Sequence, residues 1–191
     1  MRSKARLGGA LAAALAVTVV AGGSASAGEG DSAAKAQRGI DAEIEIKGGF
    51  QNLRFEGPEQ ITTGDSLTIR NLTQPGGQQG VGPHTFSLVQ RDTRPVGNQE
   101  IKQCANFTGI CAEIGEWHNV DQQGNVGDPD VDAGAAGWDK RGNFQHDGDT
   151  WYTETKDETT NRVVTAPAGR TIHYMCAIHP FMRGKFKTVA P

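Results

Sequence analysis

The stretch from Thr171 to Met182 reads TIHYMCAIHPFM and predicts a β-strand that ends in a tight loop. Over its first half, Ile172, Tyr174 and Cys176 fall on alternate positions, so they share one face of the predicted strand. Pro180 lacks a backbone donor and does not continue a strand ladder. The stretch therefore indicates a sheet protein in which the loop after this strand carries several functional side chains.

The same alternation of apolar and polar side chains recurs in short stretches along the chain. They cover residues 42–46, 52–55, 66–71, 84–89, 162–165 and 186–189. Glycine- and proline-containing turns separate them, and no apolar run at helical spacing is recognised between them. We therefore expect an all-β fold, an antiparallel Greek-key sandwich without helices.

The alternation stops between about Arg91 and Asp149, where Gly, Asp, Asn and Gln dominate. A sandwich needs only about 100 residues, so we interpret this region as one long insertion on a compact domain. It holds Cys104 and Cys111. Because an exported chain with three cysteines leaves one over, we expect a Cys104–Cys111 disulfide and a functional Cys176.

The first 27 residues have the pattern of a secretory signal peptide. Three basic residues precede an apolar stretch, and small residues end it at Ala27. We expect a leader at 28–39, a domain at 40–191, and a secreted or periplasmic location. No later stretch reaches the ~20 apolar residues of a membrane span. Without the signal segment the net charge falls from −3 to −6, which argues against a nucleic-acid partner.

The loop holds the candidate chemistry, because Cys176, His179 and Met182 follow a C-x2-H-x2-M pattern directly after the strand. A thiolate, an imidazole and a weak axial thioether suit copper. His84 begins another predicted strand and would complete a site with two histidines and one cysteine. The alternative is that Cys176 and Met182 only fill the core.

These segments resemble the plastocyanin-like cupredoxins, and amicyanins in particular. Tyr174 to Lys185 is similar to their copper loop, Gly82 to Phe86 to the segment of their first histidine, and Gly64 to Asn71 to the strand before it. The resemblance covers about 41–89 and 149–189. It implies a Greek-key sandwich with one type 1 copper ion, bound by His84, Cys176, His179 and Met182, and a role in electron transfer.

We therefore expect a monomeric one-electron carrier that docks protein redox partners near His179. The alternative is an extracytoplasmic copper-trafficking or copper-resistance protein, although such proteins often carry additional Met or His runs. A copper oxidase or reductase needs a second copper, commonly bound by His-x-His pairs, and the sequence has none. We therefore expect no enzymatic activity.

The remaining histidines and an acidic run give weaker signals. We expect His173 to be exposed on the strand face opposite Cys176, and His118 and His146 to be surface residues of the insertion. The run from Asp128 to Asp132, which includes Asp130, resembles the start of a calcium loop but has its glycine one position late. A solvated acidic loop is the favoured interpretation.

Overall fold

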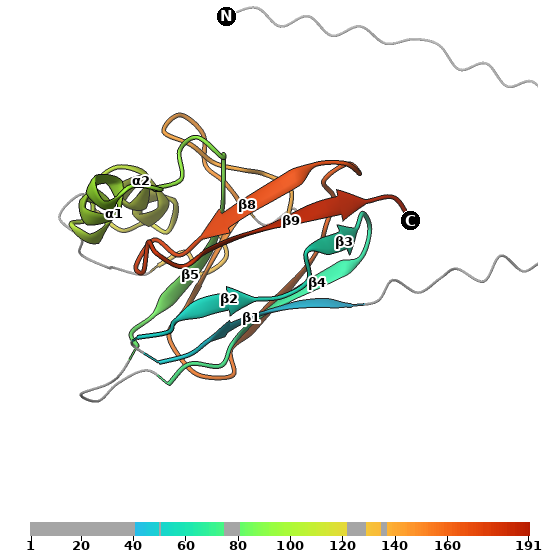
Figure 1. Ribbon diagram of the computed structural model, residues 1–191, viewed down its shortest axis with the longest axis horizontal. Coiled ribbons are helices and arrows are strands. Elements are labelled where there is room, and N and C mark those ends of the chain that lie inside the picture. The colour runs from blue at the N-terminus through green and yellow to red at the C-terminus, as the bar shows by residue number, and fades with distance from the viewer. Residues whose placement is uncertain (1–40, 50, 75–80, 122–128, 135–136) are drawn as a thin grey trace, which may run out of the picture. The chain divides into compact units, whose positions relative to one another are not determined.

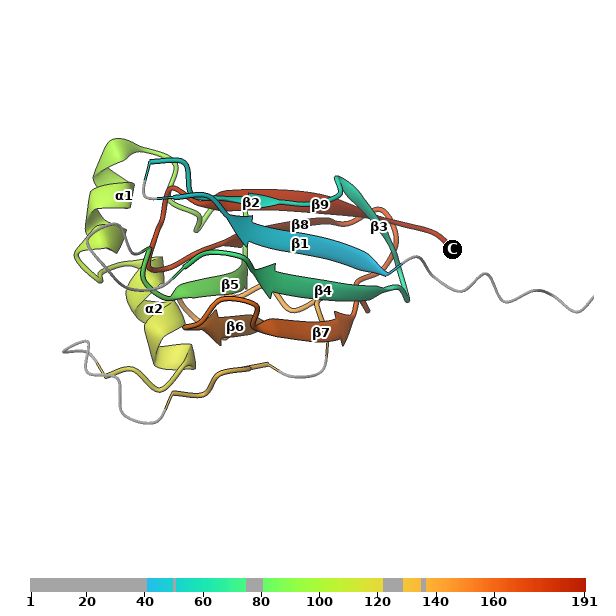
Figure 2. The same ribbon diagram turned by 90° about the horizontal axis from the view of Figure 1, so that it is seen from below.

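Two β-sheets face one another in the computed structural model, which describes residues 41–191 except 50, 75–80, 122–128 and 135–136 (Figures 1 and 2). The predicted signal segment and leader lie outside the described residues. One sheet has the order β2(Arg54–Glu56), β1(Ala42–Lys47), β4(Ser66–Asn71), β7(Thr159–Val163). The other has the order β3(Gln60–Thr62), β9(Arg183–Val189), β8(Thr171–Met175), β5(His84–Val89), β6(Thr150–Thr153).

The chain crosses between the two sheets repeatedly, as in a Greek-key sandwich. The β1–β4 and β3–β9 pairs are parallel, and the other strand pairs are antiparallel. We expected an antiparallel sandwich, so the two parallel pairs differ from that expectation. They arise because β2 and β3 lie in different sheets, and strands that are not consecutive in the chain therefore become neighbours. The predicted Greek-key β-sandwich is nevertheless confirmed.

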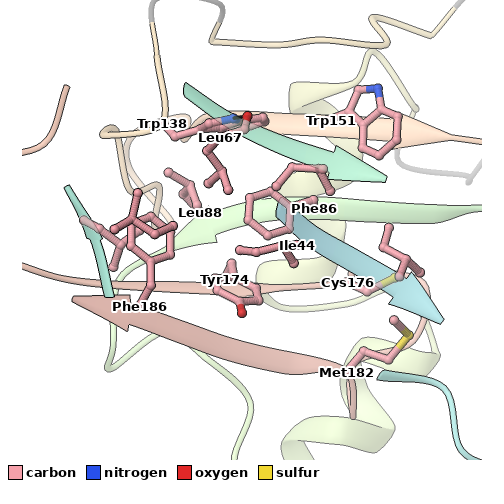
Figure 3. Packing of buried hydrophobic residues seen from close by; sticks show 14 of the residues in the cluster. Ile44, Leu67, Phe86, Leu88, Trp138, Trp151, Tyr174, Cys176, Met182 and Phe186 are labelled. Atoms are coloured by element: carbon pink, nitrogen blue, oxygen red, sulfur yellow. Dashed lines mark hydrogen bonds between the residues drawn. The ribbon is translucent and has the colours of Figure 1, made fainter. Parts of the chain in front are cut away.

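The core between the sheets is built from the inward residues of the alternating strands. Ile44 and Leu67 from one sheet and Phe86 and Tyr174 from the other are at most 4% exposed. The Phe86 ring lies 4.7 Å from that of Tyr174 and 5.2 Å from that of Trp138, which comes from the region between β5 and β6 (Figure 3). Burying a large apolar side chain stabilises a fold by roughly 1.5–3 kcal/mol, so these rings hold the two sheets firmly together.

The segment between β5 and β6 contains two helices, α1(Asn98–Ala105) and α2(Ile110–Trp117), so the expectation of a fold without helices was wrong. The expected Cys104–Cys111 disulfide is confirmed and joins them. Figures 1 and 2 place both helices at the end of the sandwich where β8 finishes.

The two helices cover the outer face of the five-stranded sheet. Their apolar side chains form a second buried cluster with residues of β5, β8 and the following loop: Val89, Cys104, Ile110, Cys111, Ile114, Trp117, Met175 and Ala177. Ile110, Ile114 and Trp117 follow helical spacing, and this signal in the sequence, which was not recognised, could have indicated α2. As a result, all six residues of β5 are buried.

Candidate metal centre

The alternation of two neighbouring strands brings the candidate ligands to one end of the sandwich. His84 is the first residue of β5 and shares the inward face of Phe86, while Cys176 follows β8 on the inward face of Tyr174. His84 and Cys176 are both 0% exposed. The loop closes on itself, because the Cys176 amide donates to the Met182 carbonyl at 3.1 Å and the Met182 amide donates to the His179 carbonyl at 2.8 Å.

One nitrogen of each imidazole faces the cysteine sulfur. Cys176 Sγ lies 4.0 Å from Nδ1 of His84 and 3.7 Å from Nδ1 of His179, and the three ligand atoms lie within 4.8 Å of one another. Metal–sulfur and metal–nitrogen bonds of about 2.3 and 2.1 Å, meeting at about 120°, separate sulfur from nitrogen by about 3.8 Å. The three side chains therefore fit around one trigonally coordinated metal ion.

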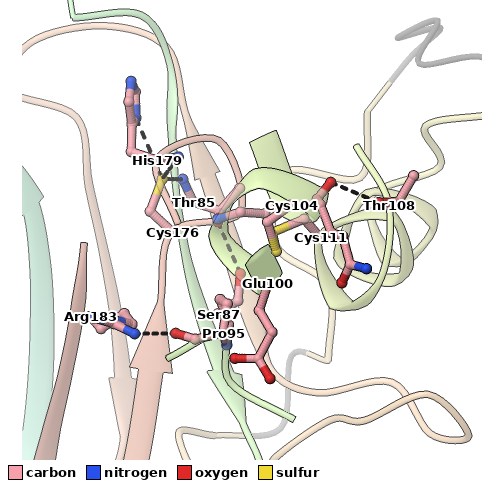
Figure 4. Close-up of a disulfide and its surroundings, with 12 residues drawn as sticks. Thr85, Ser87, Pro95, Glu100, Cys104, Thr108, Cys111, Cys176, His179 and Arg183 are labelled. Atoms are coloured by element: carbon pink, nitrogen blue, oxygen red, sulfur yellow. Dashed lines mark hydrogen bonds between the residues drawn. A yellow bond between two sulfur atoms is a disulfide. The ribbon is translucent and has the colours of Figure 1, made fainter. Parts of the chain in front are cut away.

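The sulfur also receives hydrogen bonds from the surrounding backbone. The amides of Thr85 and His179 donate to Cys176 Sγ at 3.4 and 3.3 Å (Figure 4). The Thr85 hydroxyl accepts from the Ala177 amide at 2.8 Å and so ties the loop to β5. These contacts fix the position of the sulfur and stabilise negative charge on it.

Met182 lies in the same core cluster as Cys176 and is 1% exposed. Figure 3 shows both side chains at the same end of the core. A thioether at this place suits a weak axial ligand, and the ligand role of Met182 stays a prediction.

A buried hydrogen-bond chain orients His84. The Asn71 side-chain carbonyl accepts from the Thr73 hydroxyl at 2.6 Å, which leaves the Thr73 oxygen to accept from Nε2 of His84 at 3.0 Å. The Asn71 amide is itself anchored, because it donates to the Thr153 hydroxyl at 3.0 Å. Nε2 of His84 therefore carries the proton, and the lone pair of Nδ1 faces Cys176. Sequence reasoning missed this role of Thr73, because its contact with His84 depends on the fold and not on local spacing.

Burial sets the protonation of the candidate ligands. Desolvation, and after it the charge of His179, lowers the pKa of His84 to about 4. Desolvation also lowers the pKa of His179 and raises that of the Cys176 thiol, while the amides that donate to the sulfur oppose the latter shift. Both imidazoles are thus neutral at pH 7, with lone pairs available for a metal, and a bound cation would deprotonate the thiol.

Apolar side chains flank the outer side of His179. Ile178 is 39% and Phe181 is 49% exposed, and the Phe181 ring centre lies 5.9 Å from that of half-buried His179. This edge is the most accessible approach to the cluster among the described residues of the loop.

Two histidines predicted to be exposed are buried. His173 is 7% exposed, and Nη1 of Arg94 lies 3.2 Å from its Nδ1. His118 is 2% exposed, and its ring lies between the Asp130 carbonyl and the Thr150 hydroxyl. His146 is exposed, as expected.

The acidic run is partly engaged in other contacts. The Asp132 carboxylate forms an ion pair with Arg162, and the carbonyl of Asp130 contacts His118. Asp128 lies outside the described residues. Two of the three aspartates expected in a calcium loop therefore have protein partners.

The sandwich carries His84, Cys176 and His179 as one cluster at its end, as expected from the resemblance of the sequence to cupredoxins. No family model matches the chain, and no curated protein matches it. It is similar to the solved structure of auracyanin A, a blue copper protein from Chloroflexus aurantiacus, with 20% identity, a TM-score of 0.40, and coverage of 78% of this chain and 98% of the other.

Two further solved structures show similar coverage of this chain. Reduced auracyanin from Roseiflexus castenholzii has 18% identity and a TM-score of 0.42, with 78% of this chain and 95% of the other covered. A multi-copper oxidase from Pediococcus acidilactici has 13% identity and a TM-score of 0.38, with 81% of this chain but 27% of the other covered. Among the described residues, no helix is long and apolar enough to cross a membrane.

Proposed function

We propose that this protein is an extracytoplasmic one-electron carrier that holds one copper ion through Nδ1 of His84, Sγ of Cys176 and Nδ1 of His179, with Met182 as the axial ligand. The observation that carries the proposal is the convergence of three buried donor atoms within 4.8 Å of one another. Copper bound there would supply a Cu(II)/Cu(I) couple, for which a trigonal His2Cys site with a weak axial donor is suited.

The scaffold supports such a role by limiting movement of the ligands. His84 is fixed through Thr73, and the Cys176 sulfur through the Thr85 and His179 amides. Ligands that hardly move between the two oxidation states keep the energetic cost of electron transfer low. The hydrogen bonds and the close-packed core supply this rigidity without the metal.

The exposed edge of the loop supports docking of a protein redox partner near His179. Ile178 and Phe181 present apolar surface there, and such surface is typical of interaction sites when it is clustered. The Cys104–Cys111 disulfide supports an oxidising compartment, in keeping with the signal-peptide pattern of the first 27 residues.

Copper titration of the purified mature protein tests the proposal. We expect one equivalent of Cu(II) to produce an intense visible thiolate-to-copper band, which Cys176→Ser abolishes and His84→Ala converts into the spectrum of an ordinary copper site. His146→Ala is the matched control, because that histidine is exposed, and it should behave as the parent. Absence of the band in the parent, or its survival in Cys176→Ser, would refute the proposal.

The axial role of Met182 needs a separate measurement. Met182→Leu should retain copper and raise the reduction potential, because losing a donor disfavours the oxidised ion. Met175→Leu is the control: Met175 is also fully buried but belongs to the outer cluster under the helices, so its replacement should leave the potential nearly unchanged. An unchanged potential in Met182→Leu would leave that residue a core residue only.

Copper trafficking is the alternative function, and it requires ready release of the ion. The two methionines of the described chain, Met175 and Met182, are both buried, which offers no exposed thioether for transfer. A carrier should reduce and reoxidise repeatedly without losing copper to a competing chelator, whereas a trafficking protein should lose it readily, above all in the reduced state.

A further inference from the structure

A row of buried hydroxyl groups runs from the Cys176 loop to His118. Thr85 and Ser87 occupy the outward positions of β5, between the inward residues His84, Phe86 and Leu88, and Ser87 pairs with Thr150 of β6. The helices pack on this outer face, and Thr85, Ser87, Thr150 and His118 are each at most 3% exposed.

Consecutive members of the row lie within hydrogen-bond distance. Nε2 of His118 is 2.9 Å from the Thr150 hydroxyl, which is 2.6 Å from the Ser87 hydroxyl. Ser87 donates to the Thr85 hydroxyl at 3.0 Å. The row ends beside the Cys176 sulfur, to which the Thr85 amide donates at 3.4 Å. Burial raises the pKa of the Cys176 thiol, and the nearby Thr85 hydroxyl is among the groups that oppose this rise. Figure 4 shows Ser87, Thr85 and Cys176 together.

The protonation of His118 determines which hydroxyl donates and which accepts at each hydrogen bond of the row. Nδ1 of His118 contacts the backbone carbonyl of Asp130, and because a carbonyl only accepts, Nδ1 carries a proton. In a neutral ring Nε2 is then an acceptor and takes the Thr150 hydrogen. Thr150 must in turn accept from Ser87, which leaves Ser87 no hydrogen for Thr85.

When both ring nitrogens of His118 carry a proton, the hydrogen bonds of the row are donated in the opposite direction, from His118 towards Thr85. Nε2 donates to Thr150, Thr150 donates to Ser87, and Ser87 donates to Thr85, which is the geometry observed between those two hydroxyls. The Thr85 oxygen then accepts from Ser87 and from the Ala177 amide. Its own hydrogen is free to donate to the Cys176 sulfur.

We infer that His118 is a remote positioning residue that tunes the copper site, because its protonation sets the direction of the Thr150–Ser87–Thr85 row and with it the hydrogen bond to the Cys176 sulfur. The inference rests on the proposed function. A donor to the sulfur withdraws electron density from the thiolate and favours the reduced site. Reduction by one electron from a redox partner should therefore be accompanied by uptake of a solvent proton at Nε2 of His118, and oxidation by its release.

The groups around His118 determine its pKa. Burial lowers the pKa of His118 most strongly, the carbonyl hydrogen bond and negative charge of Asp130 oppose this, and the positive charge of Arg162 on β7 adds to the lowering. Arg162 is itself paired with Asp132, and the Tyr152 ring of β6 lies 6.0 Å away. The potential should therefore fall with rising pH in a range below the usual titration range of histidine.

The reduction potential of the copper-loaded protein, measured between pH 4.5 and 8 against a ferrocyanide/ferricyanide mixture, tests the inference. We expect the proton affinity of His118 to be about tenfold higher in the reduced state, within the ordinary range of coupling between sites. For one electron this equals a total shift of about 59 mV. His118→Gln, which keeps a polar group but cannot titrate, should lose this shift.

Two further variants separate the row from alternative causes. Ser87→Ala interrupts the row but leaves His118 able to titrate, so this variant should also lose most of the pH-dependent shift in reduction potential. If the shift is retained, the charge of His118 acts on the copper without the row, and the role of the row is overturned. His173→Gln removes a buried histidine that faces Arg94 instead and should leave the shift intact. A full shift in His118→Gln would overturn the inference outright.

The visible band keeps this test distinct from that of the proposed function. A protein without the band fails as a type 1 copper protein whatever its pH behaviour. A protein with the band but with a potential independent of pH across this range retains the proposed function and refutes the role of His118.

Discussion

Replacing Thr73 by valine should weaken copper binding and destabilise the metal-free protein. Thr73 is 2% exposed, and its hydroxyl lies between Nε2 of His84 and the Asn71 carbonyl oxygen. Valine has nearly the same shape, so the substitution removes the hydrogen bonds while it keeps the volume. Any effect therefore comes from the loss of the group that orients His84.

The size of the effect depends on which buried polar groups lose their hydrogen-bond partner. Asn71 Oδ1 keeps the Thr73 backbone amide at 2.9 Å, so the one group left without a partner is the Nε2–H of His84. An unsatisfied buried donor costs about 1–3 kcal/mol. The ring then also loses its preference for the tautomer whose Nδ1 lone pair faces Cys176. Loss of such a partner of a metal ligand typically lowers metal affinity about 10- to 100-fold.

Urea unfolding of the metal-free protein and competition with a copper chelator measure the two effects. Thr73→Ser keeps the hydroxyl and is the matched control, so it should stay close to the parent in both assays. If the valine variant binds copper within about twofold of the parent, far less than the loss expected, or if serine costs as much as valine, the hydroxyl does not orient His84.

The titration of His84, the disulfide and the packing of β9 each affect the stability of the fold. The folded-state pKa of His84, about 4, lies below that of an unfolded histidine. The stability that this neutral buried ring contributes is therefore complete above pH 6.5 and is lost as the pH falls towards 4. Urea unfolding of the metal-free protein should show a loss of up to about 3 kcal/mol, and His84→Gln should reduce that loss. Replacing both cysteines of the disulfide by serine should cost about 2 kcal/mol in thermal unfolding and leave the copper band in place, since the disulfide closes only a short loop in the helical segment. Gly184→Ala would place a Cβ against the buried ring of Tyr174 and should destabilise the fold by about 1–3 kcal/mol, whereas Gly82→Ala, with no neighbouring atom within 4 Å, should have little effect.

Each of these three predictions has a result that contradicts it. A flat stability profile between pH 7 and 4 would mean that the folded protein protonates His84 as readily as the unfolded chain. Loss of the copper band in the double serine variant would make the disulfide a requirement of the site itself. Equal stability of the two alanine variants would show that β9 yields easily to accommodate a methyl group.

The sequence predicted the strands in which apolar and polar side chains alternate. Both β4 and β5 begin and end where the alternation does, at Ser66–Asn71 and His84–Val89. β3, with the three residues Gln60–Thr62, was missed because so short a strand carries no readable period. β6, at Thr150–Thr153, was missed because its four residues, Thr-Trp-Tyr-Thr, do not alternate apolar with polar side chains.

The spacing of residues in the loop, together with the position of His84 at the start of a strand, predicted which candidate ligands lie together. The groups that orient these ligands could not be predicted from local spacing. Thr73 meets His84, and Thr150 meets Ser87 and His118, only through strand register and the path of the insertion. The burial of His118 likewise depends on residues distant in the chain, Asp130 and Thr150. Local patterns report periodicity, whereas such contacts depend on the whole fold.

Strand β5 has no solvent side, and this restricts the freedom of its sequence. In β1, the buried residues Ile44 and Ile46 alternate with accessible ones, so every second position can drift among polar residues at little cost. In β5 all six side chains, from His84 to Val89, have fixed neighbours. A complete substitution scan should therefore find tolerance at every other position of β1 and at none of β5, which makes the strand that presents His84 the segment least open to evolutionary change.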